Sequence, residues 1–347
     1  MVQFSVLIVN FNSGDRLSKA ISALDAQTFR DFELLVFDNG STDGSAVKAE
    51  KLATELGLPA KFVLHDENIG FAAANNRVAE KATGEWLAFL NPDAYPYRDW
   101  LERMLEAFQR FPFADAFGST QIDATDTDYL DGAGDVYHVL GIPYRGGFGS
   151  TVASIPETGE CFSPCGAAAL YRRKAFETLG GFDERFFCYS EDVDLGFRLR
   201  LGGGSCIQVN NARVFHEGSG VTGRHSDFTV YHGNRNRIWV AFKNTPGLIY
   251  WPMLPVQVLV NLYLVARAYS FGIGKPYLRA VIDGYAGLST FSSDRRQIQR
   301  ARKASIRDIA RAFGWSPRLL ASRVPRLWPI KIAKSNALPK NLKATTS

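Results

Sequence analysis

Three acidic side chains stand within four positions in the segment Glu191-Asp192-Val193-Asp194. A carboxylate held beside a hydroxyl group can remove its proton, and neighbouring acids shift one another's pKa. The segment therefore indicates a general base that activates a hydroxyl group. An acidic first turn also stabilises a helix by complementing its dipole, so a purely structural role stays open.

A second candidate site is Asn91-Pro92-Asp93, which follows the very apolar run 86–90. A carboxylate fixed at the end of a buried strand can hold Mg²⁺ or Mn²⁺, and such a metal bridges two phosphates and neutralises a leaving diphosphate. His216, after a short expected strand at 212–215, could complete the ligands of that metal. The same tripeptide also forms simple turns, and most single histidines are not ligands.

The segment 38–45 reads Asp-Asn-Gly-Ser-Thr-Asp-Gly-Ser and follows an apolar run. A carboxylate at its start can accept the ring N–H of a uracil or thymine, while Gly and Ser allow the turn into a following helix. A capped turn with nothing bound explains the same residues. Arg235 and Arg237 offer two cations that either clamp a diphosphate or lie on a solvated helix face.

The elements that position these residues alternate along the first third of the chain. The expected strands are 4–9, 32–37, 61–65 and 86–90, and the expected helices are 17–27, 45–56 and 70–81. This order predicts an α/β fold, an open, doubly wound and mostly parallel sheet whose ligands bind at the carboxyl ends of the strands. Polar clusters stand at these ends, at 10–12, 38–43, 66–68 and 91–93, which indicates one shared ligand site.

Beyond residue 116 the periodicity weakens. Residues 117–166 are rich in Gly, Thr and Asp, so we expect loops and short antiparallel strands that line the site. Helical patterns return at 172–179 and 192–201. No internal repeat or low-complexity segment interrupts this organisation.

The pattern of apolar and charged residues changes again after residue 237. The stretch 249–271 is long and apolar, but Pro252, Pro255 and Arg267 interrupt it, whereas a spanning helix needs about 20 apolar residues. We therefore expect helices that lie at a membrane surface, followed by the basic stretch 295–311. A packed helical subdomain with a solvated basic face is the alternative.

Charge is distributed unevenly along the chain, whose formal net charge is +5. From Arg267 to the end there are 17 Lys and Arg against 3 Asp and Glu, which predicts contact with a polyanion, either anionic lipid or nucleic acid. Aromatic residues just before this region favour a membrane over nucleic acid. These residues are Tyr250, Trp251, Tyr263, Tyr269 and Phe271.

Overall composition is ordinary for a globular protein, with 347 residues of which 46% are hydrophobic. No charged n-region or cleavage site accompanies the apolar opening residues, so we expect no secretory signal. We accordingly expect the four cysteines to be reduced thiols, and their spacing does not complete a zinc site.

Six motifs occur in an order that resembles family 2 glycosyltransferases of the GT-A fold, and within them bacterial rhamnosyltransferases. The resemblance covers about residues 3–240. The motifs are Val-Asn-Phe-Asn at 9–12, the segment 38–45, Glu-Asn-Ile-Gly-Phe-Ala-Ala-Ala-Asn-Asn at 67–76, Asn-Pro-Asp at 91–93, Gly-Gly-Phe-Asp-Glu at 180–184 and Glu-Asp-Val-Asp-Leu at 191–195. Each motif is modest alone, but the set is specific.

The resemblance implies a role for each matching residue. Asp192 would be the catalytic base of an inverting transfer, with Glu191 beside it in the acceptor site. Asp93 and His216 would hold Mg²⁺ or Mn²⁺, and Asp38 would read the pyrimidine base. The expected nucleotide-sugar contacts are Val9, Asn10, Phe11, Asn12, Asp38, Asp66, Asn68, Gly70, Asn75, Asn91, Asp93, Arg235 and Arg237.

The resemblance also implies a division of the chain. The catalytic region would be 1–240, with a nucleotide-binding half at 1–116 and an acceptor-binding half at 117–240. A basic, amphipathic helical region, 241–347, would lie against an anionic membrane. The enzyme would then be cytoplasmic and peripheral at the inner face of the membrane, acting on a glycan or polyprenyl-linked acceptor in cell-surface polysaccharide synthesis.

Two departures from the family pattern bear on the donor. Asn91 stands where many relatives have the first Asp of the metal motif, and Asn75 where many have Arg. Similar versions occur among rhamnosyltransferase-like members, so we expect dTDP-rhamnose as the donor, with a UDP-sugar as the alternative. A noncatalytic nucleotide-sugar-binding protein is the alternative of another class. A nucleotidyltransferase is disfavoured because no Gly-rich, basic triphosphate loop stands near the N-terminus. Nucleic acid is not an expected partner, and the oligomeric state stays open.

Overall fold

The computed structural model describes residues 2–218 and 226–330, and its centre is one mixed sheet with the strand order β10-β12-β6-β11-β4-β1-β2-β3. The expected βαβ units form its parallel half. In that half β1 (Phe4–Asn10) lies between β2 (Phe32–Asn39) and β4 (Trp86–Leu90), and β3 (Ala60–His65) is the edge strand. The strands expected from the apolar runs are therefore confirmed to within a few residues.

The other half of the sheet differs from the expected loops. The strand β6 (Ala116–Asp123) runs parallel to β12 (Cys206–His216) and antiparallel to β11 (Ala168–Arg172). Its polar residues concealed it, because Ser119 and Thr120 are buried and find hydrogen-bond partners inside, for example Nε1 of Trp100, which donates to Oγ of Ser119 at 2.8 Å. This half also contains the short strands β5 (Ala94–Pro96), β7 (Leu130–Gly132) and β10 (Gly159–Cys161). The strands β8 (Asp135–His138) and β9 (Ile142–Arg145) pair with each other in a separate sheet, and the expected short antiparallel strands within 117–166 are thus present.

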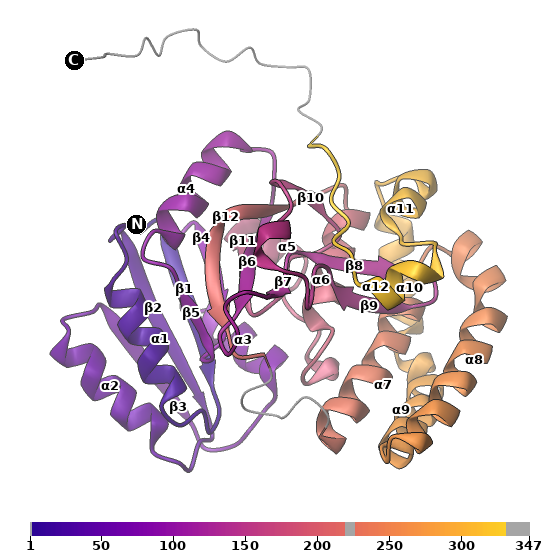
Figure 1. The fold of residues 1–347 in the computed structure, drawn as a ribbon, viewed down its shortest axis with the longest axis horizontal. Coiled ribbons are helices and arrows are strands. Elements are labelled where there is room, and N and C mark those ends of the chain that lie inside the picture. The colour runs from indigo at the N-terminus through magenta and orange to yellow at the C-terminus, as the bar shows by residue number, and fades with distance from the viewer. Residues whose placement is uncertain (1, 219–225, 331–347) are drawn as a thin grey trace, which may run out of the picture.

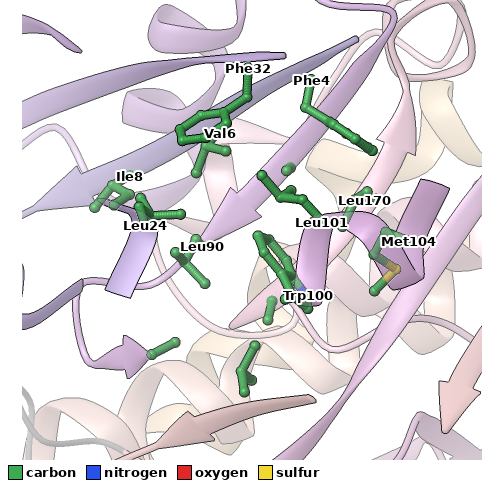
Figure 2. Packing of buried hydrophobic residues seen from close by; sticks show 14 of the residues in the cluster. Phe4, Val6, Ile8, Leu24, Phe32, Leu90, Trp100, Leu101, Met104 and Leu170 are labelled. Carbon is green, nitrogen blue, oxygen red and sulfur yellow. The ribbon is translucent and has the colours of Figure 1, made fainter. Parts of the chain in front are cut away.

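Helices cover both faces of the sheet (Figure 1). One face carries α1 (Arg16–Asp25), α2 (Ser45–Glu55) and α4 (Trp100–Arg110), and the other carries α3 (Phe71–Ala79), α5 (Arg173–Thr178) and α6 (Glu191–Leu201). Side chains of β1 alternate between them, so that Val6 and Ile8 pack toward α1 and α4 while Leu7 and Val9 pack toward α3. Figure 2 shows the first of these cores, in which Ile8 lies beside Leu24, while Met104 lies on the other side of the cluster near Leu101 and Leu170.

The parallel strands end at one edge of the sheet, and this brings distant polar clusters together. Nδ2 of Asn10 donates to Oδ1 of Asp38 at 2.7 Å, joining the ends of β1 and β2. Nδ2 of Asn39 donates to Oδ1 of Asn68 at 2.9 Å, joining the end of β2 to the segment after β3. The edge predicted to bind a ligand is therefore a continuous polar rim.

The C-terminal helices stand beside the sheet, with α7 (Asp227–Asn244), α8 (Gly247–Ser270) and α9 (Gly274–Ala286) side by side (Figure 1). The interruption expected at Pro252 and Pro255 is wrong, because α8 is one continuous helix of 24 residues. Both prolines are exposed. Among the described residues α8 alone is long and apolar enough to cross a membrane, although packed helices of soluble proteins can meet the same description.

The region after residue 240 shares a core with the catalytic half. A boundary at residue 240 falls inside α7, which continues to Asn244. Further along, Phe313 packs against Tyr137 and Phe197, and the backbone N–H of Gly314 donates to the carbonyl of Tyr137 at 2.8 Å. The remaining elements are a 3₁₀ turn at Gly287–Phe291, α10 (Ser292–Ala301), α11 (Ile306–Ala312) and α12 (Pro317–Ser322), and residues 331–347 of the predicted basic region lie outside the described residues.

Candidate active site

The polar edge of the sheet opens into a cavity of about 880 Å³ between the sheet and the C-terminal helices. Its walls come from the strand ends, from the hairpin β8–β9, from the loop 187–190 with the start of α6, and from α7, α8 and α9. Predicted residues in this wall are Val9, Phe11, Asn68, Asn91, Asp93, Glu191, Asp192, His216 and Arg237. A second hollow of about 530 Å³, beside the loop 179–185 and α10, contains none of the predicted site residues.

The carboxylate of Asp192 is held by backbone groups. Its Oδ2 accepts a hydrogen bond from the N–H of Gly166 and its Oδ1 one from the N–H of Val193, both at 2.8 Å. Burial raises the pKa of Asp192, and these two hydrogen bonds, which favour the ionised form, partly offset that rise. A Cβ at Gly166 would lie 3.1 Å from Oδ2 of Asp192, so a larger residue there would press on this carboxylate.

Glu191 is the member of the pair whose environment disfavours ionisation more strongly. Its side chain is buried, and its Oε2 has no hydrogen-bond partner among the described residues. Burial and the adjacent charge of Asp192 raise the pKa of Glu191 well above its usual range. Since Asp192 alone of the two receives hydrogen bonds from the N–H groups of Gly166 and Val193, the negative charge of the pair resides on Asp192.

Asp194, the third acid of the cluster, is structural. It points away from the cavity, where its Oδ2 accepts from Nε of Arg198 at 2.8 Å and from Nζ of Lys243 at 2.9 Å, and its Oδ1 accepts from Nδ2 of Asn244 at 2.7 Å. Burial alone would raise the pKa of Asp194, but the charges of Lys243 and Arg198 outweigh it and lower that pKa. The structural explanation of the acidic turn therefore applies to Asp194.

The loop before α6 is strained and firmly held. Phe187, Tyr189 and Ser190 have positive φ values of 66°, 73° and 67°, which side chains other than glycine rarely adopt. Nδ2 of Asn236 donates to the carbonyls of residues 186, 188 and 189 at 2.9, 2.8 and 2.7 Å. Strain of this kind persists only where the surroundings impose it, so Asn236 sets the position from which α6 and Asp192 start.

At the opposite wall, Asp93 and His216 face each other. Nε2 of His216 lies 3.4 Å from Oδ1 of Asp93, and its Nδ1 lies 2.6 Å from Oδ2 of Asp131. Arg145 also donates to that oxygen of Asp131. Burial opposes the charged imidazole, but the hydrogen bonds and charges of the two carboxylates outweigh it and raise the pKa of His216 to about 9.

These residues fit a divalent metal that is completed by its substrate. No group of three or more His, Cys, Asp or Glu within the described residues forms a metal site by itself. Mg²⁺ and Mn²⁺ sites in phosphate-transferring enzymes commonly use one or two protein ligands together with phosphate oxygens. Asp93 and Nε2 of His216 supply two donors, and Oδ1 of Asn91, buried with no hydrogen-bond partner among the described residues, is a third donor in the same cavity wall.

At the nucleotide end, the side chain in the wall is Asn39 rather than Asp38. Successive residues of a strand point to opposite sides, and Asp38 points under the rim, where it accepts from Nδ2 of Asn10 at 2.7 Å and from the N–H of Ser41 at 3.3 Å. Asn39 instead accepts from the N–H of Ile69 at 3.0 Å and lines the cavity. The described wall thus places Asp38 behind the surface that a nucleotide base would meet.

Several other predicted contacts also lie behind the wall or outside it. Asn12 accepts from the N–H of Thr42, and Asn75 is buried within α3, bonded to the carbonyl of Phe71. A Cβ on Gly70 would lie 2.6 Å from the ring of Phe187, so this glycine allows the catalytic loop to pack. The predicted residues absent from the described wall are Asn10, Asn12, Asp38, Asp66, Gly70, Asn75 and Arg235.

The two arginines of α7 differ. Arg235 lies outside the wall, with its guanidinium 4.1 Å from the ring centroid of Trp239 and a hydrogen bond to the carbonyl of Phe186. Arg237 lines the cavity, is 6% exposed and bonds to neutral groups, Asn261 and the hydroxyl of Tyr277, the latter at 3.0 Å. No carboxylate among the described residues pairs with Arg237, so its charge is available to an anionic ligand.

Sequence reasoning missed four residues of this site, which are Asn39, Asp131, Arg145 and Asn236. The alternation of side chains along a strand could have indicated Asn39, since only one of two neighbours can face the ligand. No local signal marks Asp131 and Arg145, which stand in a segment read as loops. No sequence pattern distinguishes Asn236 from its neighbours Arg235 and Arg237, which are charged and were the expected ligands.

Comparisons with known proteins identify the family of the chain. Residues 5–180 match the sequence model of the family described as Glycosyl transferase family 2. Over 242 residues the chain is 31% identical to an N-acetylglucosaminyl-diphospho-decaprenol L-rhamnosyltransferase of Mycobacterium tuberculosis, covering 63% of this chain and 77% of that protein.

Two solved structures show the same fold at low sequence identity. One is GalNAc-T7 with UDP, GalNAc and Mn²⁺, at a TM-score of 0.59 and 17% identity, covering 74% of this chain and 51% of that one, so the present chain spans about half of it. The other is the mannosyltransferase PcManGT from Pyrobaculum calidifontis in complex with GDP-Man and Mn²⁺, at a TM-score of 0.54 and 17% identity, covering 86% of each chain.

Proposed function

The chain belongs to glycosyl transferase family 2 and has the GT-A fold, and from that premise we propose that it transfers L-rhamnose from dTDP-rhamnose to a lipid-linked glycan, with inversion and with the help of a divalent metal. One observation carries the proposal. Asp192, with its carboxylate oriented by two backbone N–H groups, lines the same cavity as Asp93 and His216. A base for the acceptor and ligands for the donor diphosphate thus share one chamber.

The base acts on the acceptor hydroxyl. Asp192 takes the hydroxyl proton as the oxygen attacks the anomeric carbon, and the bond from that carbon to the diphosphate oxygen breaks on the opposite side. The carboxylate ends protonated, and the nucleoside diphosphate leaves with the bonding electrons. A single displacement of this kind inverts the anomeric centre, and no covalent sugar intermediate is needed. Glu191, protonated beside Asp192, can donate a hydrogen bond to the acceptor.

Asp93 and His216 would hold the metal, with Oδ1 of Asn91 as the third donor. A bound divalent cation would offset the charge that develops on the diphosphate as it leaves. Asp131 accepts from Nδ1 of His216, which fixes the ring and leaves Nε2 directed at the site. Arg145 balances the charge of Asp131 and keeps that carboxylate in place.

For the nucleotide, we assign the base contacts to Asn39 and Asn68, beside Val9 and Phe11 in the wall. An Asn side chain both donates and accepts, which suits the edge of a pyrimidine. Asp38 then acts from behind, by orienting Asn10 and the turn at Ser41. The choice of dTDP-rhamnose is supported by the mycobacterial relative, a rhamnosyltransferase that is 31% identical.

The acceptor and the location follow from the same relative, whose name gives a diphospho-decaprenol acceptor. We propose a polyprenyl-linked acceptor for this chain and a peripheral position at the cytoplasmic face of the membrane. The exposed apolar helix α8 and the excess of Lys and Arg after Arg267 support that position. We place the GT-A region at residues 1–244, where α7 ends, and the helical region after it.

Release of nucleoside diphosphate from dTDP-rhamnose and from a panel of UDP-sugars, with Mn²⁺ or with EDTA, tests this function. We expect metal-dependent release from dTDP-rhamnose and a loss of about a thousandfold in kcat for Asp192→Asn, with donor binding retained. Asp99→Asn, an acid on the surface at the start of α4, is the matched control. Turnover of the Asp192→Asn variant at the rate of the unchanged protein would refute the assignment of the base.

A further inference from the structure

The helix α8 buries two polar side chains and exposes apolar ones. Its polar side chains Gln257 and Asn261 point into the protein and are 5% and 2% exposed. On the opposite side Leu259 is 67% exposed and Leu262 is 57% exposed. A helix that faces water shows the reverse arrangement, because apolar side chains are stabilised by burial. The outer side of α8 is therefore built for an apolar environment.

This apolar side extends onto the neighbouring helix. We call it the α8–α9 face and define it by six exposed side chains, Trp251, Val256, Leu259, Leu262 and Tyr263 of α8 and Ile282 of α9. Figure 1 shows α8 and α9 at the edge of the molecule, away from the sheet. Contiguous exposed apolar surface of this kind marks a contact with a membrane or a partner.

Charge favours a membrane as the contact. The 24 residues of α8 include no Asp or Glu. The exposed cations Arg267, Lys275 and Arg279 stand at the end of α8 and along α9, at the border of the apolar residues. Aromatic rings such as Trp251 and Tyr263 together with a basic border are typical of surfaces that enter the head-group layer of an anionic bilayer.

The face adjoins the catalytic cavity. Leu264 of α8 and Tyr277 of α9 line the same cavity as Asp192, so these two helices form the wall between the cavity and the α8–α9 face. At this point Arg237 is hydrogen-bonded to Asn261 and Tyr277. A buried cation in this wall suits a phosphate that is carried on a lipid.

We propose that the α8–α9 face lies in the interfacial layer of an anionic lipid bilayer and that the acceptor enters the cavity from this side, past Leu264 and Tyr277. The contact with the bilayer is inferred from the α8–α9 face alone, whereas the entry of the acceptor rests on the proposed function. The helix α8 lies along the membrane and does not cross it, because crossing would expose Gln257 and Asn261 to hydrocarbon and break their contacts inside the protein.

Flotation of the full chain with lipid vesicles tests the bilayer contact. The vesicles contain phosphatidylcholine alone or with about 30% phosphatidylglycerol, at low salt. We expect flotation with the anionic vesicles and a loss of about a hundredfold in partitioning for the double variant Leu259→Glu, Leu262→Glu. The matched control is Val47→Glu, Leu64→Glu, whose positions are 68% and 63% exposed on the other side of the sheet.

Two further measurements define the orientation. Brominated lipids should quench tryptophan fluorescence, and Trp251→Phe should remove most of that quenching, since Trp251 lies on the face and is 56% exposed. Alkaline carbonate should release the protein from the vesicles, and retention after carbonate would instead show that α8 crosses the bilayer. The double variant Lys275→Gln, Arg279→Gln should lose the preference for anionic over neutral vesicles.

The proposal is overturned if the unchanged chain does not float, or if the Leu259, Leu262 variant floats as well as the control. It is also overturned if the chain forms a dimer that this variant dissociates and vesicles do not, because the face would then contact a second copy. Calorimetric binding of dTDP with Mn²⁺ is measured on the same samples. If the unchanged chain does not bind dTDP, the proposed function is refuted, while the flotation result still stands.

Discussion

Oδ2 of Asp131 lies 2.6 Å from Nδ1 of His216, a residue 85 positions further along the chain. Because Nδ1 is engaged in this way, the other ring nitrogen, Nε2, is directed toward Asp93. Carboxylates that hold a metal-binding histidine fix its ring and raise its basicity, and their loss weakens metal affinity by about ten- to a hundredfold. The strand β7 therefore serves the site through Asp131.

Replacement of Asp131 by Asn should weaken the binding of Mn²⁺ in the presence of dTDP by about tenfold or more. Electron paramagnetic resonance of free Mn²⁺ measures this affinity directly, without turnover. Asp99→Asn, far from the cavity at the start of α4, should leave the affinity unchanged. Equal affinities in the two variants would show that Asp131 only anchors Arg145.

The pH dependence of kcat/KM should show an acid limb above the range of an ordinary Asp, whose pKa is about 3.9. Burial raises the pKa of Asp192, and a base must be ionised to act, so activity falls as pH decreases through this raised pKa. Glu191→Gln should leave the limb in place, because Glu191 is still protonated when Asp192 ionises. If the acid limb of the pH profile moves in Glu191→Gln, then Glu191 and not Asp192 is the group that must ionise for activity.

The substitution Asn236→Ala should lower kcat by about tenfold to a hundredfold with a smaller effect on the KM for the donor. The carbonyls of Cys188 and Tyr189 lose the amide that holds them, the carbonyl of Phe186 loses one of its donors, and the strained loop that leads to Asp192 relaxes. Asn211→Ala, an exposed position of β12 whose side chain does not line the cavity, is the matched control. Similar kcat values for the two variants would contradict a positioning role of Asn236.

Nucleotide recognition distinguishes Asn39 from Asp38. Asn39→Ala should weaken dTDP binding by about tenfold, since it removes a side chain from the cavity wall, and should also lower thermal stability because the N–H of Ile69 loses its acceptor. Asp38→Ala should lower stability in the same way, because Asn10 and the N–H of Ser41 lose a buried acceptor, with a smaller effect on dTDP binding. Calorimetric titration and thermal unfolding of both variants separate these effects, and the opposite pattern would return base recognition to Asp38.

The parts of the fold that the sequence predicts are those with a local signal. Apolar runs and caps in residues 4–90 predict strands and helices to within a few residues of those observed. The strand β6 was missed because Ser119 and Thr120 are buried and satisfied by residues distant in sequence, such as Trp100. A polar strand inside a sheet has no local pattern.

The site was predictable to the same extent. Asp93, Asp192 and His216 follow strands or start a helix, and all three line the cavity. The partners Asp131 and Asn236 act through contacts that only the tertiary structure creates. Helix α8 shows the converse limit, because the prolines of its sequence predicted an interruption, while the packing of Gln257 and Asn261 keeps the helix continuous.

The last prediction concerns Lys243, a buried cation that joins α7 to α6. Its Nζ donates to Oδ2 of Asp183 at 2.7 Å and to Oδ2 of Asp194 at 2.9 Å. Lys243→Met should destabilise the protein by up to about 3 kcal/mol at neutral pH, because each of two buried carboxylates loses one of its two cations, while Arg185 and Arg198 remain. Lys48→Met, whose partner Asp15 is on the surface, is the control and should change the free energy of unfolding by less than about 1 kcal/mol.

The difference in the free energy of unfolding between Lys243→Met and the unchanged protein should depend on pH, because the pKa values of Asp183 and Asp194 are lowered in the folded protein. Burial would raise the pKa of Asp183, but Arg185 and Lys243 outweigh it. Burial would likewise raise the pKa of Asp194, but Lys243 and Arg198 outweigh it. Depressed carboxyl pKa values stabilise the folded state above the unfolded pKa of about 4, and the stabilisation is lost as pH falls through the folded values. In Lys243→Met the same acids can take up protons, so the gap between the variant and the unchanged protein should narrow from pH 7 toward pH 5. Urea unfolding at the two pH values measures the gap, and a gap that widens on acidification would mean that Lys243 acts by packing and not by charge.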